Sequence, residues 1–335
     1  LILMNPRIGN LFQFCKNIKM NKHKPKLLIV EKNNFSKENF NKLSKYFNVT
    51  LGCKSLKDNI NNFSVIFVRL KNYLTDDLIS INSKLQIICS PTTGVNHIKI
   101  SNKRVKIISL RDCRNQMKEI NSTCELTFGL LFSLLRKIPS AMKDVERKNW
   151  NRNKFSGSDI KNKIVGIIGF GRLGKASFKV LKSFGANIIT YDKKHDTKKV
   201  FNKLISKSDI ILIHMSYTED NYHFFNKELF RKMKKNCILV NTARGELINQ
   251  TDLIYALKNK IIGGAALDVI DNEYNLKTTS NVKLLEYLKK NENLIVTPHI
   301  GGMTLESLRK VETFIVDKLI ERIINGKYKF RKTEV

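Results

Sequence analysis

Short apolar runs separated by amphipathic segments recur along the chain from Lys26 onward. In the first third, the pattern predicts strands at 26–31, 64–69, 85–90 and 105–110, and helices at 36–46 and 75–82. Alternating strands and helices are typical of βαβ units, which build a parallel sheet covered by helices. The pattern therefore predicts an α/β domain over residues 25–121.

A second alternating series begins at Lys163, after a long apolar helix that is predicted over 121–137 with Ser122 or Thr123 as its N-cap. The series predicts strands at 163–169, 187–192, 209–214, 237–243, 263–269 and 293–299, and helices at about 172–184, 227–234 and 250–259. A last amphipathic helix is predicted over about 304–325, ending at Gly326. Residues 122–296 are therefore expected to form a second parallel-sheet domain.

The composition agrees with two soluble domains. The 335 residues are 42% hydrophobic and 27% charged, and the longest apolar stretch is far shorter than the ~18 residues of a membrane span. The six cysteines form no C-x-x-C pair, which argues against a zinc ribbon or a disulfide framework. We expect reduced thiols, a cytoplasmic location, no metal and no membrane partner.

The net charge of +32 is the one unusual number. It indicates either a polyanionic partner such as nucleic acid, or a coding bias towards lysine and asparagine. No basic stripe interleaved with aromatic residues is present, so we favour the bias and expect no specific nucleic-acid partner.

The segment 1–24 has no acidic residue, and the first in the chain is Glu31. It is either an organelle transit peptide or an upstream extension of the reading frame. We favour the extension and expect a poorly ordered leader.

A glycine fingerprint follows the first strand of the second series. Gly169, Gly171 and Gly174 form G-x-G-x-x-G between a predicted strand and a predicted helix. The next strand ends in Asp192, where a carboxylate can bind the two hydroxyls of an adenosine ribose and repel a 2′-phosphate. The fingerprint predicts dinucleotide binding, with NAD preferred over NADP.

The six predicted strands of the second domain all end in glycine or polar residues. In order, these are Gly169, Asp192, His214, Thr242 to Arg244, Asp268 and His299. Ligands of open α/β sheets bind beyond the carboxyl ends of the strands, so these residues are expected to share one crevice.

Several motifs resemble the D-isomer-specific 2-hydroxyacid dehydrogenase family. They are T-A-R-G-E (242–246), A-L-D-V-x-x-x-E (266–273), P-H-I-G-G (298–302), S-P-T-T-G-V-N-H-I (90–98) and S-T-C-E (122–125). The resemblance covers about residues 26–325. It implies two doubly wound parallel-sheet domains, with a Rossmann NAD-binding domain (122–296) inserted into a flavodoxin-like substrate domain (25–121 plus 297–326).

The resemblance implies that Arg244, Glu273 and His299 are catalytic. Reducing a 2-oxo acid needs a proton donor, and imidazole suits that role near neutral pH. Glu273 would orient the ring, and Arg244 would offer a planar fork of donors to the substrate. The family's usual Glu-Pro is Glu273-Tyr274 here, and residues 274–292 are expected to contain an inserted helix.

The resemblance also implies binding residues on both domains. Besides the fingerprint and Asp192, the cofactor residues are expected to be Arg172, Leu173, His214, Thr242, Ala243, Asp268, Gly301 and Gly302. The expected substrate residues are Arg69, Gly94 and Val95.

These residues predict an NAD-dependent oxidoreductase that interconverts a D-2-hydroxy acid and its 2-oxo acid. Arg69 and the positive charge favour a phosphoglycerate-like anion. The alternative is an NAD(H)-sensing, corepressor-like binding protein on the same fold. A homodimer is expected from the resemblance, with the helix at 122–137 as its contact.

Overall fold

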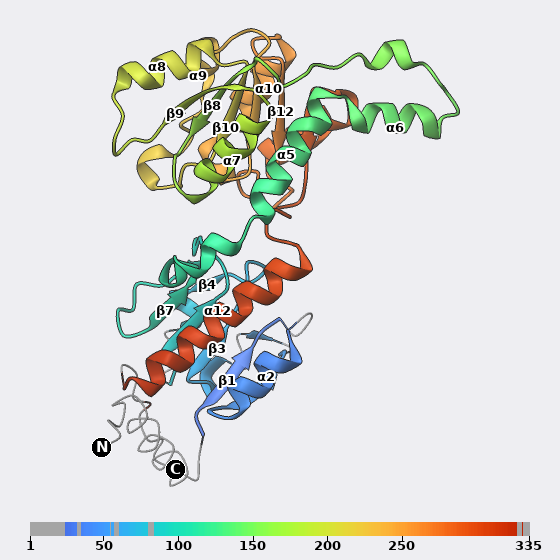
Figure 1. The fold of residues 1–335 in the computed structure, drawn as a ribbon. Helices are drawn as coiled ribbons and strands as arrows, with labels where there is room; N and C mark the ends of the chain where they lie inside the picture. Colours follow the sequence, from blue (N-terminus) through green and yellow to red (C-terminus); the bar gives the residue numbers. More distant parts are fainter. Residues whose placement is uncertain are drawn as a thin grey trace. The chain divides into compact units, whose positions relative to one another are not determined.

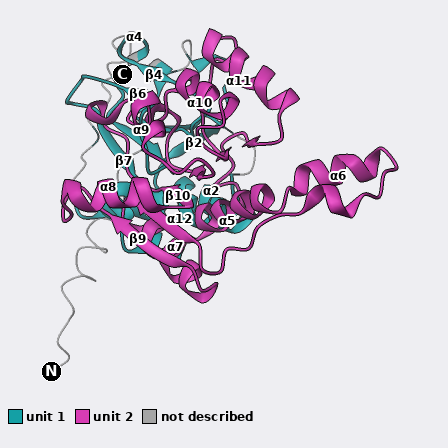
Figure 2. Cartoon of the chain, turned by 90° about the horizontal axis from the view of Figure 1, so that it is seen from above, with its two compact units in different colours: residues 1–119, 305–335 teal, residues 120–304 magenta. Residues whose placement is uncertain are grey.

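The computed structural model describes residues 24–31, 35–53, 55–56, 60–79, 84–326 and 330. The expected leader therefore lies, except for Lys24, outside the described residues. The chain divides into two compact units: unit 1 contains residues 1–119 and 305–335, and unit 2 contains residues 120–304 (Figures 1 and 2).

Unit 1 is built on a parallel sheet with strand order β2-β1-β3-β5-β7. The strands are β1 (Lys26–Ile29), β2 (Asn48–Leu51), β3 (Val65–Phe67), β5 (Ile87–Ser90) and β7 (Lys106–Ser109). The three strands in the middle of the sheet are buried almost throughout, because a parallel sheet is covered on both faces. A separate pair of two-residue strands joins β4 (Leu74–Thr75) to β6 (Ile98–Lys99).

Two helices from opposite ends of the chain pack against each other in unit 1. They are α2 (Lys37–Ser44), which begins after the N-cap Ser36, and α12 (Leu305–Ile324), which packs on α2, β5 and β7. Gly326 follows α12 with φ +68°, the left-handed conformation that ends many helices. A short helix, α4 (Asp76–Ile79), follows β4.

A buried carboxylate holds α12 in place. The Glu312 side chain is 1% exposed, and its Oε2 accepts a hydrogen bond from Arg69 at 2.9 Å. Its Oε1 accepts from the Ser36 backbone at 2.9 Å and from Asn39 Nδ2 at 2.8 Å. A buried carboxylate is tolerated when a cation and donors satisfy it, so Glu312 joins α12, α2 and the segment after β3.

Unit 2 contains a six-stranded parallel sheet with order β13-β12-β11-β10-β8-β9. The strands are β8 (Ile164–Ile168), β9 (Asn187–Tyr191), β10 (Ile210–Ile213), β11 (Ile238–Asn241), β12 (Gly264–Leu267) and β13 (Leu294–Val296). The direction in which strands are added reverses between β8 and β10, which is the position where such sheets bind ligands.

Helices cover both faces of this sheet. Along β10, Ile210 and Leu212 pack on one face with α5 (Ser122–Leu135) and α7 (Arg172–Ser183). Ile211 and Ile213 pack on the other face, which is covered by α8 (Lys198–Lys207), α9 (Lys227–Arg231), α10 (Gln250–Lys258) and α11 (Thr279–Lys290). Alternate side chains of a strand point to opposite faces, so this one strand serves both cores.

A projecting arm leaves unit 2 after α5. It contains α6 (Ile138–Glu146) and the following segment to about residue 157, and Figure 2 shows it extending from the body of the unit. Four large apolar side chains of the arm are exposed: Ile138 (40%), Met142 (60%), Val145 (51%) and Trp150 (87%). By contrast, α5 buries eight of its 14 residues within unit 2.

Most of the predicted elements are present, with small shifts at their ends. Helices α6 and α8 and the strands β2, β4 and β6 were not predicted. The N-cap of α5 was also wrong: Asn121 occupies that position, and its side chain makes no capping hydrogen bond. The five described cysteines are all free, and burial raises the pKa of Cys237 to about 12.

We expect Glu312→Ala to lower the free energy of unfolding by about 3 kcal/mol, because it leaves the partly buried Arg69 unpaired. Urea unfolding followed by circular dichroism measures the effect. Asp317→Ala is the matched control on the same helix, since Asp317 is half exposed and pairs with Lys42 at 3.3 Å. Equal, small effects of the two substitutions would contradict a structural role for the buried carboxylate.

Candidate active site

The carboxyl ends of three adjacent strands bring the predicted catalytic segments to one edge of unit 2. In the register of the sheet, Asn241 of β11 pairs with Leu267 of β12, and Leu267 pairs with Val296 of β13. The three strands therefore end level with one another. The segments that follow them carry Arg244, Asp268 to Glu273, and His299.

The three fingerprint glycines occupy positions with different constraints. Gly169 has φ +95°, and a Cβ there would lie 2.4 Å from the Met215 backbone nitrogen. A Cβ on Gly174 would lie 2.2 Å from the Gly169 carbonyl oxygen, so the helix packs closely on the turn. Gly171, the N-cap of α7, has nothing within 4 Å of its Cβ position. The turn is thus tight on its inner side and open at the start of the helix.

Asp192 lies directly beside this turn. Its Oδ2 accepts a hydrogen bond from the Phe170 backbone at 3.2 Å, and its Oδ1 accepts one from the Lys194 backbone at 3.1 Å. The structure therefore brings the acid after β9 next to the glycine turn after β8. Arg172 and Leu173 are the first residues of α7, and the Arg172 guanidinium donates to the Ile120 carbonyl.

His214, predicted as a cofactor residue, faces α7. Its Nε2 lies 2.8 Å from the Ser177 hydroxyl, and its Nδ1 is buried without a hydrogen-bond partner among the described residues. Burial, and to a lesser degree the nearby Arg172 charge, lowers the pKa of His214 to about 4. His214 is therefore neutral near pH 7, and it supports the helix beneath the glycine turn.

Asp268 organises the turn that carries His299. The residue is 1% exposed. Its Oδ1 accepts hydrogen bonds from Thr297 Oγ1 at 2.7 Å and from the Ile300 backbone at 2.8 Å. Its Oδ2 accepts from the Gly301 backbone at 2.7 Å. All three donors belong to residues 297–301. Both oxygens of this carboxylate therefore bind the turn and hold it in one conformation.

The same turn holds His299 in a left-handed conformation with φ +53°. Its backbone N–H donates to the Asp268 carbonyl at 2.8 Å. On the ring, Nδ1 lies 2.5 Å from Glu273 Oε1, and both side chains keep about a fifth to a quarter of their surface exposed. Nε2 has no hydrogen-bond partner among the described residues, so it is the ring atom left for a ligand.

The turn after β11 touches the segment that leads to Glu273. A Cβ on Gly245 would lie 2.0 Å from the Ile270 carbonyl carbon and 2.4 Å from the Asp271 backbone nitrogen. Only glycine permits this approach. This contact places Arg244, one residue earlier, beside the loop that carries Glu273. The Arg244 guanidinium donates to the Ala243 carbonyl at 2.7 Å and is partly exposed.

The remaining predicted cofactor residues lie between these turns. The buried Thr242 hydroxyl lies 2.8 Å from the hydroxyl of Thr127 on α5. A Cβ on Gly301 would lie 3.0 Å from Asp268 Oδ2, whereas Gly302 has open space at that position. A side chain at position 301 would therefore crowd the Asp268 carboxylate, whereas position 302 has room for one.

In unit 1, Gly94 and Val95 lie in the loop after β5. The Thr92 hydroxyl donates to the Gly94 carbonyl at 2.7 Å, and the loop is supported by Ser90, whose hydroxyl lies 3.1 Å from Nε2 of the buried His97. No described residue accepts a hydrogen bond from the backbone N–H of Gly94 or Val95. Both groups are therefore unpaired within the described part of the chain, with Gly94 buried and Val95 partly exposed.

Arg69, the other predicted substrate residue, is already engaged. Its guanidinium is paired with the buried Glu312, and its side chain is 18% exposed. Its backbone N–H donates to Glu31 Oε2 at 3.0 Å. The Arg69 guanidinium thus takes part in the buried ion pair that holds α12 in unit 1.

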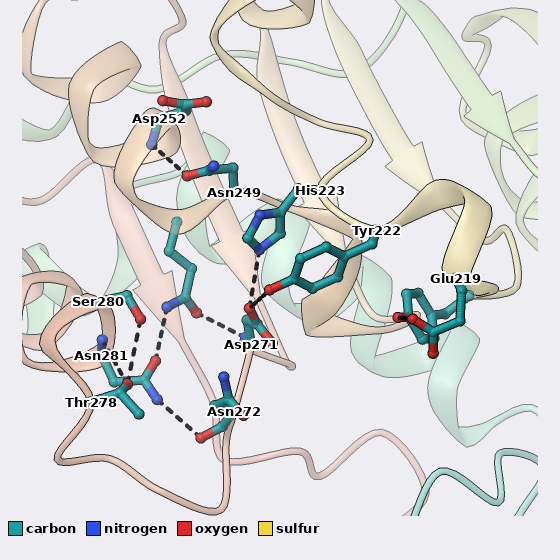
Figure 3. Close-up of polar contacts among 12 residues, drawn as sticks. Glu219, Tyr222, His223, Asn249, Asp252, Asp271, Asn272, Thr278, Ser280 and Asn281 are labelled. Atoms are coloured by element: carbon teal, nitrogen blue, oxygen red, sulfur yellow. Dashed lines mark hydrogen bonds and ion pairs between the residues drawn. The ribbon is translucent and has the colours of Figure 1, made fainter.

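Sequence reasoning missed the residues that support the site. Thr123 donates to the Gly301 carbonyl at 3.1 Å, and Gln250 accepts from the Asp271 backbone, two residues before Glu273. Asn281 donates to the Asn272 carbonyl in the same loop (Figure 3). Each is a polar residue on a helix that is otherwise largely apolar at its buried positions. That pattern was the available signal, although the partner of a buried amide cannot be read from the chain.

The turn at the start of α7 fits a dinucleotide. The open Gly171 leaves room for a close approach to the backbone, and the N-terminus of α7 offers unpaired N–H groups to a pyrophosphate. Asp192 lies beside the turn as an acceptor for ribose hydroxyls. No group of three or more His, Cys, Asp or Glu residues with metal-binding geometry occurs in the part of the chain that is described.

Comparison with known proteins identifies the family. The family described as "D-isomer specific 2-hydroxyacid dehydrogenase, NAD binding domain" matches residues 128–301. The D-3-phosphoglycerate dehydrogenase of Methanocaldococcus jannaschii is 32% identical over 287 residues, covering 82% of this chain and 52% of that protein. The glyoxylate reductase of Thermofilum pendens is 30% identical over 281 residues, covering 80% of each. The chain belongs to the D-isomer-specific 2-hydroxyacid dehydrogenase family.

A solved structure supports the fold class. The D-lactate dehydrogenase of Aquifex aeolicus, complexed with NAD and lactic acid, has a TM-score of 0.76 at 24% identity, covering 90% of this chain and 96% of that one. The predicted family, α/β fold class and NAD-binding domain are thus confirmed. The chain spans about half the length of the D-3-phosphoglycerate dehydrogenases it matches, 52% and 50%. Among the described residues, no helix has the length and apolar character to cross a membrane.

The buried His214 predicts a specific loss of stability in mild acid. In the unfolded chain its pKa is near 6.5, and in the folded chain it is about 4, so protons bind the unfolded state more readily between these values. Lowering the pH from 7 to 5 should cost about 2 kcal/mol of unfolding free energy through this group. In His214→Gln, which keeps a polar group for Ser177, this component should vanish. Chemical unfolding at both pH values measures it, and an unchanged pH dependence would contradict the assignment.

Proposed function

We propose that the protein is an NAD-dependent oxidoreductase that interconverts a D-2-hydroxy acid and its 2-oxo acid. The observation that carries this proposal is the pair of His299 and Glu273, with Nδ1 and Oε1 2.5 Å apart and Nε2 left for a ligand. An imidazole that is oriented by a carboxylate is suited to donate and recover a proton near neutral pH. The pair follows β12 and β13 of the same parallel sheet in which β8 leads to the glycine turn.

Bound NADH would supply the hydride that reduces the carbonyl carbon of the substrate. His299 would donate the proton from Nε2 to the carbonyl oxygen, while Glu273 stabilises the positive ring through Nδ1. In the oxidative direction His299 would take the proton back from the hydroxyl group. Arg244 would bind the substrate carboxylate and carbonyl oxygen with the planar fork of its guanidinium.

The cofactor would be held by the edge of unit 2. The backbone N–H groups of Arg172 and Leu173 would bind the pyrophosphate, and Asp192 would accept from the ribose hydroxyls and disfavour a 2′-phosphate. Thr242, Ala243 and Asp268 would border the nicotinamide, and Gly301 and Gly302 would allow its close approach. Asp268 has its oxygens committed to the 297–301 turn, so we assign it chiefly to positioning His299.

Unit 1 would be the substrate domain, with the free N–H groups of Gly94 and Val95 as carboxylate donors. Arg69 is the residue that was expected to bind a second anionic group of the substrate, such as a phosphate. Because Glu312 already neutralises it, the structure supports a phosphoglycerate-like substrate less than the sequence did. We favour a 2-oxo acid whose only anionic group is its carboxylate. The thiols of the five described cysteines are free and mostly buried, which suits a reducing compartment such as the cytoplasm.

We further propose a homodimer that is formed through the arm at 138–157. Exposed Ile138, Met142, Val145 and Trp150 cluster on this arm, whereas α5, the contact expected from the sequence, is largely buried inside its own unit. The occupant that we propose is a second copy of the chain, because large apolar side chains exposed together on one segment are typical of a protein–protein contact. Asp144 braces the arm, bound by Lys154 at 3.3 Å and by Asn149 at 3.3 Å.

The enzymatic proposal is tested by following NADH oxidation with glyoxylate, pyruvate and an aromatic 2-oxo acid, and NAD reduction with 3-phosphoglycerate. We expect turnover with an unphosphorylated 2-oxo acid, and a kcat at least about 100-fold lower in His299→Gln. NADH binding, followed by fluorescence, should be unchanged in that variant and serves as its control. NADH binding without turnover of any substrate would contradict the proposal and support the NAD(H)-sensing alternative.

The dimer proposal predicts that Val145→Asp, together with Met142→Asp, yields a monomer, because it places charges in the apolar contact. Sedimentation equilibrium should give twice the 38.7 kDa chain mass for the wild type and the single mass for the variant. Leu51→Asp, at an exposed apolar position of unit 1, is the control and should remain dimeric. Trp150 is the single tryptophan, so its emission should shift to the red in the monomer. A wild-type monomer at micromolar concentration would contradict the proposal.

A further inference from the structure

The loop that presents Glu273 has little packing of its own. It lies between β12 and α11, and residues 272 and 274–277 are exposed. Asn272 adopts a left-handed conformation with φ +51°. The loop has two backbone hydrogen bonds of its own, from Asn275 to the Asn272 carbonyl at 2.9 Å and from Thr278 to the Asn275 carbonyl at 3.2 Å. Further contacts are therefore needed to hold Glu273 at 2.5 Å from His299.

A buried amide lies beneath this loop. Asn281, in the first turn of α11, is 0% exposed. Its Nδ2 donates to the carbonyl oxygens of Asn272 and Asn275, each at 3.0 Å, so it binds the backbone on both sides of Glu273. Its Oδ1 accepts from Gln250 Nε2 at 2.8 Å. Only one orientation of the amide satisfies all three partners.

Gln250 continues the network to the start of the loop. It is 4% exposed, and its Oε1 accepts from the Asp271 backbone N–H at 2.8 Å. On the opposite side, the Asp271 carboxylate accepts from the Tyr222 hydroxyl at 3.1 Å and lies 3.0 Å from His223 Nε2 (Figure 3). The residues at positions 271, 272 and 275 are therefore all bound, while Glu273 between them faces His299.

We propose that Asn281 and Gln250 are positioning residues for Glu273, acting through the backbone of residues 271–275. This inference rests on the proposed function, because it assumes that Glu273 orients the catalytic imidazole. A buried, fully satisfied polar network fixes a loop in one conformation, whereas its loss lets the carbonyl oxygens turn to water. The loop then moves by a fraction of an ångström or more, and the proton transfer by His299 loses its alignment.

The test is a double-mutant cycle in the NADH-dependent reduction of the best 2-oxo acid. Asn281→Ala should lower kcat by about 10- to 100-fold, with the KM for NADH nearly unchanged. In a Glu273→Ala background, the same substitution should have no further effect on kcat, because its target is gone. Tyr287→Phe is the control on α11: it removes only the hydrogen bond of that hydroxyl to Asn293 and should keep kcat.

The outcomes separate the two proposals. A normal kcat in Asn281→Ala, while Glu273→Ala is impaired, overturns the positioning role alone. The same conclusion follows if Asn281→Ala lowers kcat by the same factor in the wild type and in the Glu273→Ala background. A normal kcat in Glu273→Ala overturns the assigned role of Glu273 and the positioning proposal with it. If Asn281→Ala does not fold, Gln250→Ala supplies the same cycle, since it removes only the link to the Asp271 backbone and to Asn281.

Discussion

The buried carboxylate of Asp268 is the contact on which the geometry of the site depends. It collects three hydrogen bonds from residues 297–301, and its own carbonyl accepts from the His299 backbone. A left-handed histidine costs on the order of 1–3 kcal/mol, and such a conformation persists only where its surroundings over-determine it. Asp268, directly after β12, thus supports the turn after β13. It fixes the position of the His299 imidazole although it lies 31 positions earlier in the chain.

Parallel strands make this arrangement possible. Because β11, β12 and β13 end level with one another, their following turns form one layer in which each supports the next. Gly245 packs against the backbone at Ile270, Asp268 holds the turn of His299, and Gln250 and Asn281 hold the loop of Glu273. The reactive side chains therefore lie on short loops, while the polar residues that position them lie on the sheet and on the helices.

The sequence predicted the main sheets well because their strands are continuous apolar runs between helices. It did not predict β2, because most residues of this strand are exposed. It did not predict α8 either, because this lysine-rich helix has few buried positions. The candidate site residues were predicted from motifs, and the structure places His299 and Glu273 in contact with each other. The ion pair of Arg69 could not be predicted, because its partner Glu312 lies 243 residues away and no local pattern indicates such a pair. The network of Asn281 was not predicted either, because the sequence does not show which groups a buried amide will contact, even when they lie 6 to 31 positions away.

The most direct test of this account is a crystal structure of the chain with NAD and its D-2-hydroxy acid. We expect the substrate hydroxyl to lie within hydrogen-bond distance of His299 Nε2, with the substrate carboxylate on Arg244 and the Nδ1–Glu273 contact retained. A substrate bound away from His299, or an imidazole turned so that Nε2 faces Glu273, would contradict it.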